Sequence, residues 1–151
     1  MKKRFGREGF SMSRDKELYE ARRWLETAAE DLEASRVLLE KEKYSHACFF
    51  AQQCGEKSLK ALWLAIGEDP WGHSIQKLIT EIPDPGAREW METVLEDGTI
   101  LDRYYIPTRY PNGLPDLTPG KVYFQKDGEL CLSTGARILD RVRQYFNTLS
   151  P

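Results

Sequence analysis

The sequence feature that most constrains the fold is the polar pattern of residues 45–66. Four polar side chains of this stretch fall on one narrow face of a helix with 3.6 residues per turn: Gln53, Glu56, Lys57 and Lys60. The opposite side is apolar or small: Ala47, Ala51, Cys54, Gly55, Ser58, Leu62 and Ala65. Because the polar face spans only about 100° of the circumference, one neighbour cannot cover the apolar remainder. We therefore expect a helix at the centre of a bundle or at an interface between subunits.

A regular heptad precedes this stretch and predicts its first packing partner. Leucines recur every seven residues, and the first three are each followed three positions later by a small residue: Leu18, Ala21, Leu25, Ala28, Leu32, Ser35 and Leu39. Such a pattern suits close antiparallel packing of helices, and Ser13 is the expected N-cap. After a short break at residues 43–45, the chain is expected to turn back as a helical hairpin that Gly67 ends.

The remaining segments are also helical in period. We expect a short amphipathic helix over about 75–82, a third long helix over about 86–105 and a last helix over about 124–148, with a kink or an early end at Gly98 as an alternative for the third. Residues 106–120, rich in proline and glycine, form a long loop of the kind that serves a site or an interface. The prediction is an all-α protein, an up-and-down four-helix bundle with an additional short helix and a long Pro-rich loop.

Length, charge and hydropathy bound the class of protein. The chain has 151 residues, 40% hydrophobic and 30% charged, as in one soluble domain. We expect residues 13–151 to form that domain and residues 1–12 to be a flexible basic tail. The net charge of −2 argues against a broad basic surface for duplex nucleic acid but permits one cationic pocket. No apolar run approaches the roughly 18 residues of a membrane span, and no signal peptide follows the tail, so we expect a cytoplasmic protein with no membrane partner.

Several kinds of active site have no counterpart in the sequence. Cys48, Cys54 and Cys131 lie within apolar helical patterns, as small buried residues of a reducing compartment do, and they make no metal-ligand pattern with His46. Glycine motifs for phosphates or dinucleotides and the nucleophile elbow are lacking. With His46 and His73 as the only histidines, a nucleophile–base triad has little material. We predict neither a metal nor a cofactor.

The polar face of residues 45–66 allows two interpretations. Glu56 and Lys60 are spaced as an i,i+4 ion pair, which stabilises an exposed helix by only about 0.3 kcal/mol. The face is then a solvated surface with routine pairing. The alternative is a placed site, which the narrowness of the face favours.

Two further features carry candidate chemistry. His73 follows a glycine at the start of the short helix, where it serves either as a cap or surface residue or as a group that exchanges protons with a ligand. Arg109 and Tyr110 open the long loop; an arginine suits phosphate and a tyrosine offers a stacking face for a base. The alternative for Arg109 is a pair with a helix C-terminus or with Asp102.

Together these residues resemble the HEPN domain family, most of all its small stand-alone prokaryotic members. The resemblance covers roughly residues 17–149 and rests on three motifs: Tyr44-x-x-Ala47-x-Phe49-x-x-Gln52-Gln53-x-x-Glu56-Lys57-x-x-Lys60-Ala61, Gly72-His73-Ser74, and Tyr105-Ile106-Pro107-Thr108-Arg109-Tyr110-Pro111. It implies an up-and-down helical bundle, usually a homodimer, that binds nucleotides or RNA. Small members of the family often accompany a minimal nucleotidyltransferase in two-gene modules of the toxin–antitoxin type.

One family motif is missing. HEPN ribonucleases resemble one another in an Arg-x4-6-His motif, whose two side chains converge at the dimer interface to cleave RNA. Here no arginine lies five to seven residues before His46 or His73, and the last helix has arginines but no histidine. RNA cleavage by the usual route of the family is therefore not expected.

We accordingly expect a non-catalytic homodimer that binds a nucleotide, an RNA end or a nucleotidyltransferase partner. The predicted roles place three cations on phosphate, one ring on a base and two groups in orienting positions: Lys57, Lys60 and Arg109; Tyr110; Glu56 and His73. The alternatives are a ribonuclease that uses His73 and Arg109 as an acid–base and phosphate pair, and a purely structural interaction module.

Overall fold

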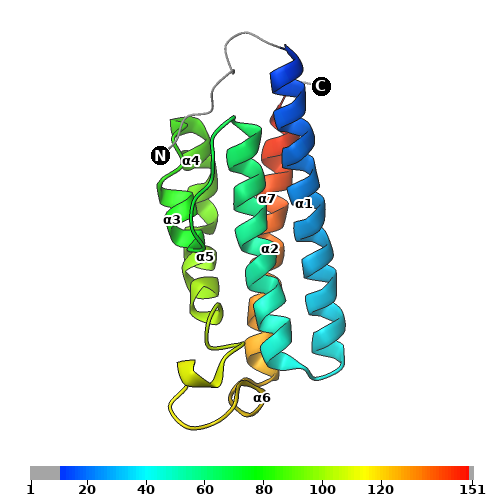
Figure 1. The fold of residues 1–151 in the computed structure, drawn as a ribbon, viewed down its shortest axis with the longest axis vertical. Helices are drawn as coiled ribbons and strands as arrows, with labels where there is room; N and C mark the ends of the chain where they lie inside the picture. Colours follow the sequence, from blue (N-terminus) through cyan, green and yellow to red (C-terminus); the bar gives the residue numbers. More distant parts are fainter. Residues whose placement is uncertain (1–10, 150–151) are drawn as a thin grey trace.

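The fold is taken from a computed structural model that describes residues 11–149. The elements in chain order are α1 (Ser11–Glu40), α2 (Tyr44–Ala65), α3 (Ile75–Thr80), α4 (Pro85–Met91), η1 (Glu92–Val94), α5 (Leu95–Leu101), η2 (Asp102–Tyr104), η3 (Pro111–Gly113), α6 (Pro119–Val122) and α7 (Gln125–Thr148). The long helices α1, α2 and α7 run side by side, and α3, α4 and α5 together form the fourth layer (Figure 1). Within residues 11–149 there is no strand. The predicted all-α, up-and-down bundle is confirmed.

The N-terminal prediction is only partly within the described residues. α1 begins at Ser11, so Ser13 lies inside the helix and is not its N-cap, contrary to the prediction. Residues 1–10 of the predicted tail lie outside the described part of the chain, and the tail stays a prediction. No helix within residues 11–149 is long and apolar enough to cross a membrane.

The small residues of the heptad face α2, as predicted. Ala21, Ala28 and Ser35 are completely buried, and the Ser35 hydroxyl donates to the Ala47 carbonyl across the helix pair at 2.7 Å. Small side chains at the contact let the two backbones approach closely. This hydrogen bond gives the Ser35 hydroxyl a partner at a position that is buried away from water.

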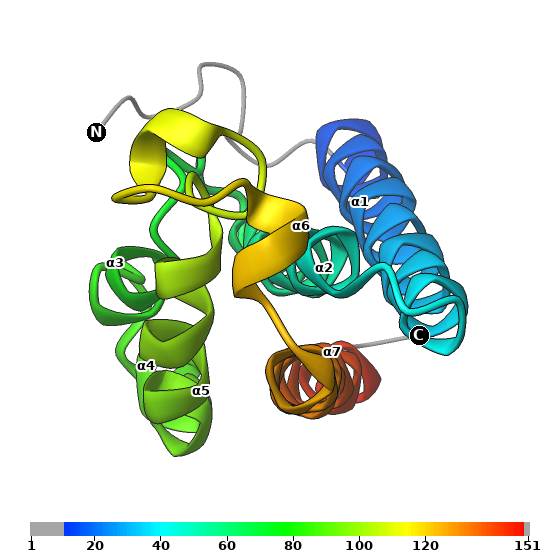
Figure 2. The same cartoon turned by 90° about the horizontal axis from the view of Figure 1, so that it is seen from below.

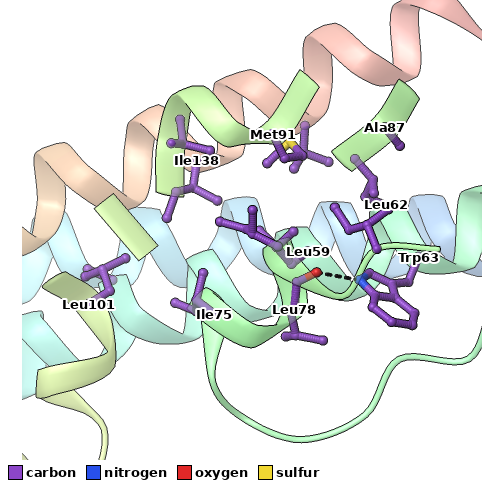
Figure 3. Packing of buried hydrophobic residues seen from close by; sticks show 14 of the residues in the cluster. Leu59, Leu62, Trp63, Ile75, Leu78, Ala87, Met91, Leu101 and Ile138 are labelled. Carbon is purple, nitrogen blue, oxygen red and sulfur yellow. Dashed lines mark hydrogen bonds between the residues drawn. The ribbon is translucent and has the colours of Figure 1, made fainter. Parts of the chain in front are cut away.

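The central position predicted for the second helix is confirmed. Seen from the end of the bundle, α2 lies between α1 and the short helices, with α7 across from it (Figure 2). Its contact with α7 is so close that a Cβ on Gly135 would lie 3.0 Å from the carbonyl oxygen of Ala51. Leu59 and Leu62 of α2 pack with Ile75, Leu78 and Met91 of the short helices and with Ile138 of α7 in the main core (Figure 3).

The third long helix is broken, so the prediction of one helix over 86–105 is wrong. α4 and α5 are separated by the 3-10 turn η1. At the break, the Trp90 carbonyl accepts a hydrogen bond from Arg141 Nε of α7 at 2.9 Å. A side chain thus satisfies a carbonyl near the end of α4. Gly98 lies inside α5 and makes no kink; a Cβ there would lie 2.8 Å from Ile75 Cγ2, so the glycine instead allows close packing of α3 on α5.

The loop predicted over 106–120 lies at one end of the bundle, continues to residue 124 before α7 begins, and contains two short helical turns, η3 and α6. It is fixed at its start by buried Thr108, whose hydroxyl donates to the Tyr104 carbonyl at 2.7 Å. It ends where the Phe124 amide donates to Asp127 Oδ2 at 2.9 Å, which caps α7. Both ends of the loop are therefore held against the bundle, and its first residues lie beside α2.

Candidate functional site

Glu56 is the centre of the candidate site. Although it lies on the polar face of α2, the residue is only 4% exposed. Its Oε2 accepts from Lys60 Nζ at 3.0 Å and lies 3.2 Å from His73 Nδ1, while Oε1 accepts from Gln52 Nε2 at 3.2 Å. A buried carboxylate is costly unless it is paired and hydrogen-bonded. Glu56 meets this condition through its contacts with Gln52, Lys60 and the exposed His73.

His73 reaches Glu56 because the chain after α2 runs back down beside that helix (Figure 1). Gly67, with φ of 78°, ends α2 in the left-handed region and starts this return. The His73 side chain is 60% exposed, so its own burial does not fix its place. The anchor is the following helix, α3, whose N-terminus is held by Asp102.

Asp102 caps α3 from a distant part of the chain. Its two carboxylate oxygens accept from Ser74 Oγ at 2.8 Å, from the Ile75 amide at 2.7 Å and from the Gln76 amide at 3.0 Å. A carboxylate is favourable at a helix N-terminus, where amides lack partners and the helix dipole is positive. The pair of Asp102 with Arg109, which the sequence left open, is not what forms; Asp102 instead fixes the segment that carries His73.

Arg109 lies among aromatic rings. Its guanidinium carbon is 4.6 Å from the ring centroids of both Phe49 and Tyr105 and 5.0 Å from that of Tyr110. Its Nε donates to the Tyr105 carbonyl at 3.1 Å. Cation–π contacts and one backbone bond therefore hold the guanidinium. Within residues 11–149 its two terminal nitrogens make no hydrogen bond.

Tyr105 joins the two halves of the site. Its ring is stacked on that of His73, with centroids 5.1 Å apart and planes inclined by 21°, and it also contacts Arg109. We name Glu56, Lys60, His73, Tyr105 and Arg109 the Glu56 cluster. It contains two permanent cations, one anion and one histidine, so it is positively charged.

The structure brings together four of the six residues that the sequence predicted for the site. Glu56, Lys60, His73 and Arg109 form one connected group. Tyr110 lies at its edge, 48% exposed and in contact with Arg109. Lys57 points the other way and pairs with Asp31 of α1 at 2.6 Å.

Sequence reasoning missed three residues of the site. Tyr105 and Gln52 entered the prediction as parts of the family motifs, without a role of their own. Asp102 was considered only as a partner of Arg109. The sequence could have indicated Tyr105, because it lies only four residues before Arg109, where Pro107 ends the preceding helical segment. The capping role of Asp102 had no local signal, since the helix that it caps lies 26 to 28 residues earlier.

The cysteines are buried, as predicted. Cys48, Cys54 and Cys131 are free thiols with no exposed surface. Burial raises the pKa of the Cys54 thiol to about 12, and the neighbouring Cys48 together with burial raises the pKa of Cys131. Thiols in this state are poor nucleophiles. Within residues 11–149 no group of three potential metal ligands comes together.

Comparison with known proteins agrees with this description. The model of the HEPN domain family matches residues 21–145. The chain is 38% identical to TT1696 from Thermus thermophilus, with a TM-score of 0.74 over 82% of this chain and 96% of that one. It is 34% identical to ST0689, described as an archaeal HEPN homologue, with a TM-score of 0.69 over 83% and 96%.

A more distant relative carries a functional name. "Putative toxin MJ1304" of Methanocaldococcus jannaschii is 26% identical in an alignment 146 residues long. The alignment covers 83% of this chain and 87% of that protein. The family match spans most of the helical bundle and includes every residue of the Glu56 cluster. With that extent of agreement in sequence and fold, the chain belongs to the HEPN domain family.

Proposed function

We propose that the protein binds the phosphate group of a nucleotide or of RNA at the Glu56 cluster. The observation that carries the proposal is Arg109, whose guanidinium is held by aromatic rings while its terminal nitrogens are left for a ligand. Lys60 lies on the other side of the cluster, anchored by Glu56. Two preorganised cations suit a phosphate, since charge-assisted hydrogen bonds to phosphate are the strong ones. Tyr110 supplies an exposed ring for a base.

The proposed role of the whole protein is that of one component in a two-gene module of the toxin–antitoxin type. Its relationship to "Putative toxin MJ1304" supports this. In this proposal the protein is a homodimer, and a minimal nucleotidyltransferase encoded nearby is its partner. Light scattering of the purified chain tests the dimer, and co-purification with the product of an adjacent nucleotidyltransferase gene tests the partner. A monomer at micromolar concentration contradicts the first part, and failure to co-purify contradicts the second.

A second candidate, a ribonuclease, is favoured by one observation. The buried Glu56 carboxylate lies 3.2 Å from His73 Nδ1 and leaves Nε2 directed away from that bond. A carboxylate that orients a histidine is a frequent device in acid–base catalysis, and Arg109 is near enough to share Tyr105 with His73. An RNA cleavage assay decides: activity that is lost in His73→Ala supports this candidate, and activity that survives in it removes this version.

The binding proposal is tested by titration of the protein with AMP, ATP and short RNAs in a calorimeter. Arg109→Ala and Lys60→Gln are expected to weaken binding at least tenfold, because charged hydrogen bonds contribute about 1.5–3 kcal/mol. Glutamine at position 60 keeps a donor for Glu56, and Lys126→Ala, at an exposed position of α7, is the matched loss of one charge.

Two outcomes would contradict the binding proposal. One is no binding by the wild-type protein; the other is binding that the Arg109 and Lys60 variants leave unchanged. If the same variants change only the oligomeric mass, the third alternative, a purely structural interaction module, takes its place.

A further inference from the structure

We propose that the ligand is a single-stranded oligonucleotide, and that a second base-binding subsite lies beside Lys60, in a groove between α1 and α2 at Trp24. The inference rests on the proposed function and deepens it, because it replaces a mononucleotide by a strand of two or more nucleotides. It also gives a place to Lys57, which the structure separates from the Glu56 cluster.

The groove has the dimensions and the wall of a small binding site. Its volume is about 250 Å³, and it is lined by Glu20, Arg23, Trp24, Thr27 and Lys57. That is below the range of about 300–1,000 Å³ usual for drug-sized ligands, so the groove suits one flat group rather than a large molecule. Trp24 is half-buried: it packs against the cluster of Ala21, Leu64 and Ala65 and keeps part of its ring at the surface.

Lys60 connects this groove to the Glu56 cluster. Its ammonium nitrogen lies 5.8 Å from the centroid of the Trp24 ring and 3.0 Å from Glu56 Oε2. Glu56 in turn contacts His73, which is stacked on Tyr105. Lys60 thus lies between the Trp24 ring and the part of the Glu56 cluster that His73 and Tyr105 form. In a single strand, two successive bases are joined through a phosphate, and Lys60 is placed to take that phosphate.

The charges in the groove indicate what kind of group it takes. Lys57 Nζ is bound to Asp31 Oδ2 at 2.6 Å, and Arg23 Nη1 is bound to Glu20 Oε2 at 2.9 Å. Each cation of the groove is therefore balanced by a carboxylate, whereas Arg109 of the Glu56 cluster has no carboxylate partner within residues 11–149. A second phosphate gains little here, whereas a base gains the face of Trp24. The groove is suited to stacking, which every base can do and which is the common mode of single-strand recognition.

The test is fluorescence anisotropy with labelled RNA and DNA strands of one to six nucleotides, measured on the full chain. Wild-type affinity is expected to rise at least tenfold from one nucleotide to three and then level off. Trp24→Leu keeps an apolar side chain against Leu64 but has no aromatic face, and is expected to lose this gain while its affinity for the mononucleotide stays unchanged. Trp24→Phe keeps a ring and is expected to retain most of the gain. The two kinds of strand show whether the 2′-hydroxyl contributes.

The outcomes separate this inference from the function on which it rests. Wild-type binding that does not depend on length, or that Trp24→Leu leaves intact for every length, overturns the Trp24 subsite and keeps the proposed function. An equal loss for mononucleotide and trinucleotide in Trp24→Leu also overturns it, because the effect is then general. Absence of binding at every length overturns both. Circular dichroism of each variant confirms that it is folded.

Discussion

Within residues 11–149, two arginines lie on aromatic rings, and they differ in what else they contact. Arg141 of α7 has its guanidinium carbon 3.7 Å from the Trp90 centroid; its Nε donates to the Trp90 carbonyl at 2.9 Å, and Trp90 Nε1 donates back to the Arg141 carbonyl at 3.0 Å. We name this pair the α4–α7 clasp. Arg109 contacts three rings but makes one backbone bond, to Tyr105 only four residues away.

This difference distinguishes a structural arginine from an arginine that is a candidate for ligand binding. The clasp joins residues 51 positions apart, and Arg141 Nη1 has a further partner in Gln144 at 3.2 Å. Its donors are used to tie helices together. Arg109 ties no distant backbone; it contacts Tyr105, on which His73 is stacked, and the exposed Tyr110. Both arginines contact aromatic rings, so this contact alone does not indicate a function. The function is indicated by the remaining hydrogen-bond donors of each arginine and by the residues around it.

The largest expected effect is on the clasp. Trp90→Ala is expected to lower the free energy of unfolding by about 3 kcal/mol, since it removes a half-buried ring together with its hydrogen bond. Urea unfolding followed by circular dichroism measures this. Trp71→Ala is the control, because Trp71 is 76% exposed and its loss is expected to change stability by less than about 0.5 kcal/mol. Equal losses in the two variants would show that the clasp does not hold α4 to α7.

Arg109→Ala reverses the pattern. We expect the free energy of RNA binding to weaken by about 2 kcal/mol, the contribution of a hydrogen bond to a charged group, with stability within about 0.5 kcal/mol of the wild type. Arg141→Ala is expected to lower stability and leave RNA affinity unchanged. Calorimetric titration and urea unfolding on both variants give all four numbers. The comparison breaks if the two arginines affect the same property.

The salt dependence of RNA affinity reports how many cations of the protein contact phosphate groups. With Lys60 and Arg109 as two contacts, the slope of log affinity against log salt is expected to be about −1.4 for a single strand. Affinity then falls roughly sevenfold between 50 and 200 mM salt. Anisotropy titrations over that range measure the slope. A slope near zero would remove the phosphate role of Arg109, and a slope several times steeper would show that cations outside the Glu56 cluster dominate.

Asp102 is the intermediate case, because it serves structure and site together. Asp102→Ala removes the distant cap of α3 and is expected to lower the free energy of unfolding by about 1 kcal/mol. RNA affinity is expected to fall a few-fold as the segment with His73 loosens. Asp102→Asn keeps a capping oxygen and should lie near the wild type in both respects. If Asp102→Ala changes stability alone, the position of His73 does not contribute to binding.

The sequence predicted what depends on local periodicity. The wide apolar arc of residues 45–66 placed α2 at the centre, and the small residues of the heptad identified the contact of α1 with α2. The bounds of the last helix were nearly right, since Gln125–Thr148 compares with the expected 124–148. The prediction of one long third helix failed. At the break, the Trp90 carbonyl accepts a hydrogen bond from Arg141, which lies 51 positions later in the sequence. Periodicity carries no information on such a partner.

The sequence predicted which types of residue form the candidate site, but not how these residues are arranged in space. Helical spacing put Glu56 beside Lys60, and this contact forms. The same spacing grouped Lys57 with them, whereas tertiary packing gives Lys57 to Asp31 of α1. The approach of His73 to Glu56 depends on the path of the chain after Gly67 and on the cap that Asp102 provides. Neither is encoded within one helix.

We propose that the Glu56 cluster binds a nucleotide phosphate and is not a set of routine ion pairs. The most direct test is a titration of isotopically labelled protein with a short single-stranded RNA, followed by amide chemical shifts. We expect changes concentrated at residues 49–60, 71–76 and 102–110, together with residues 20–27 at the Trp24 subsite, and no change at the α4–α7 clasp. Shifts confined to other surfaces, or none at saturating RNA, would contradict it.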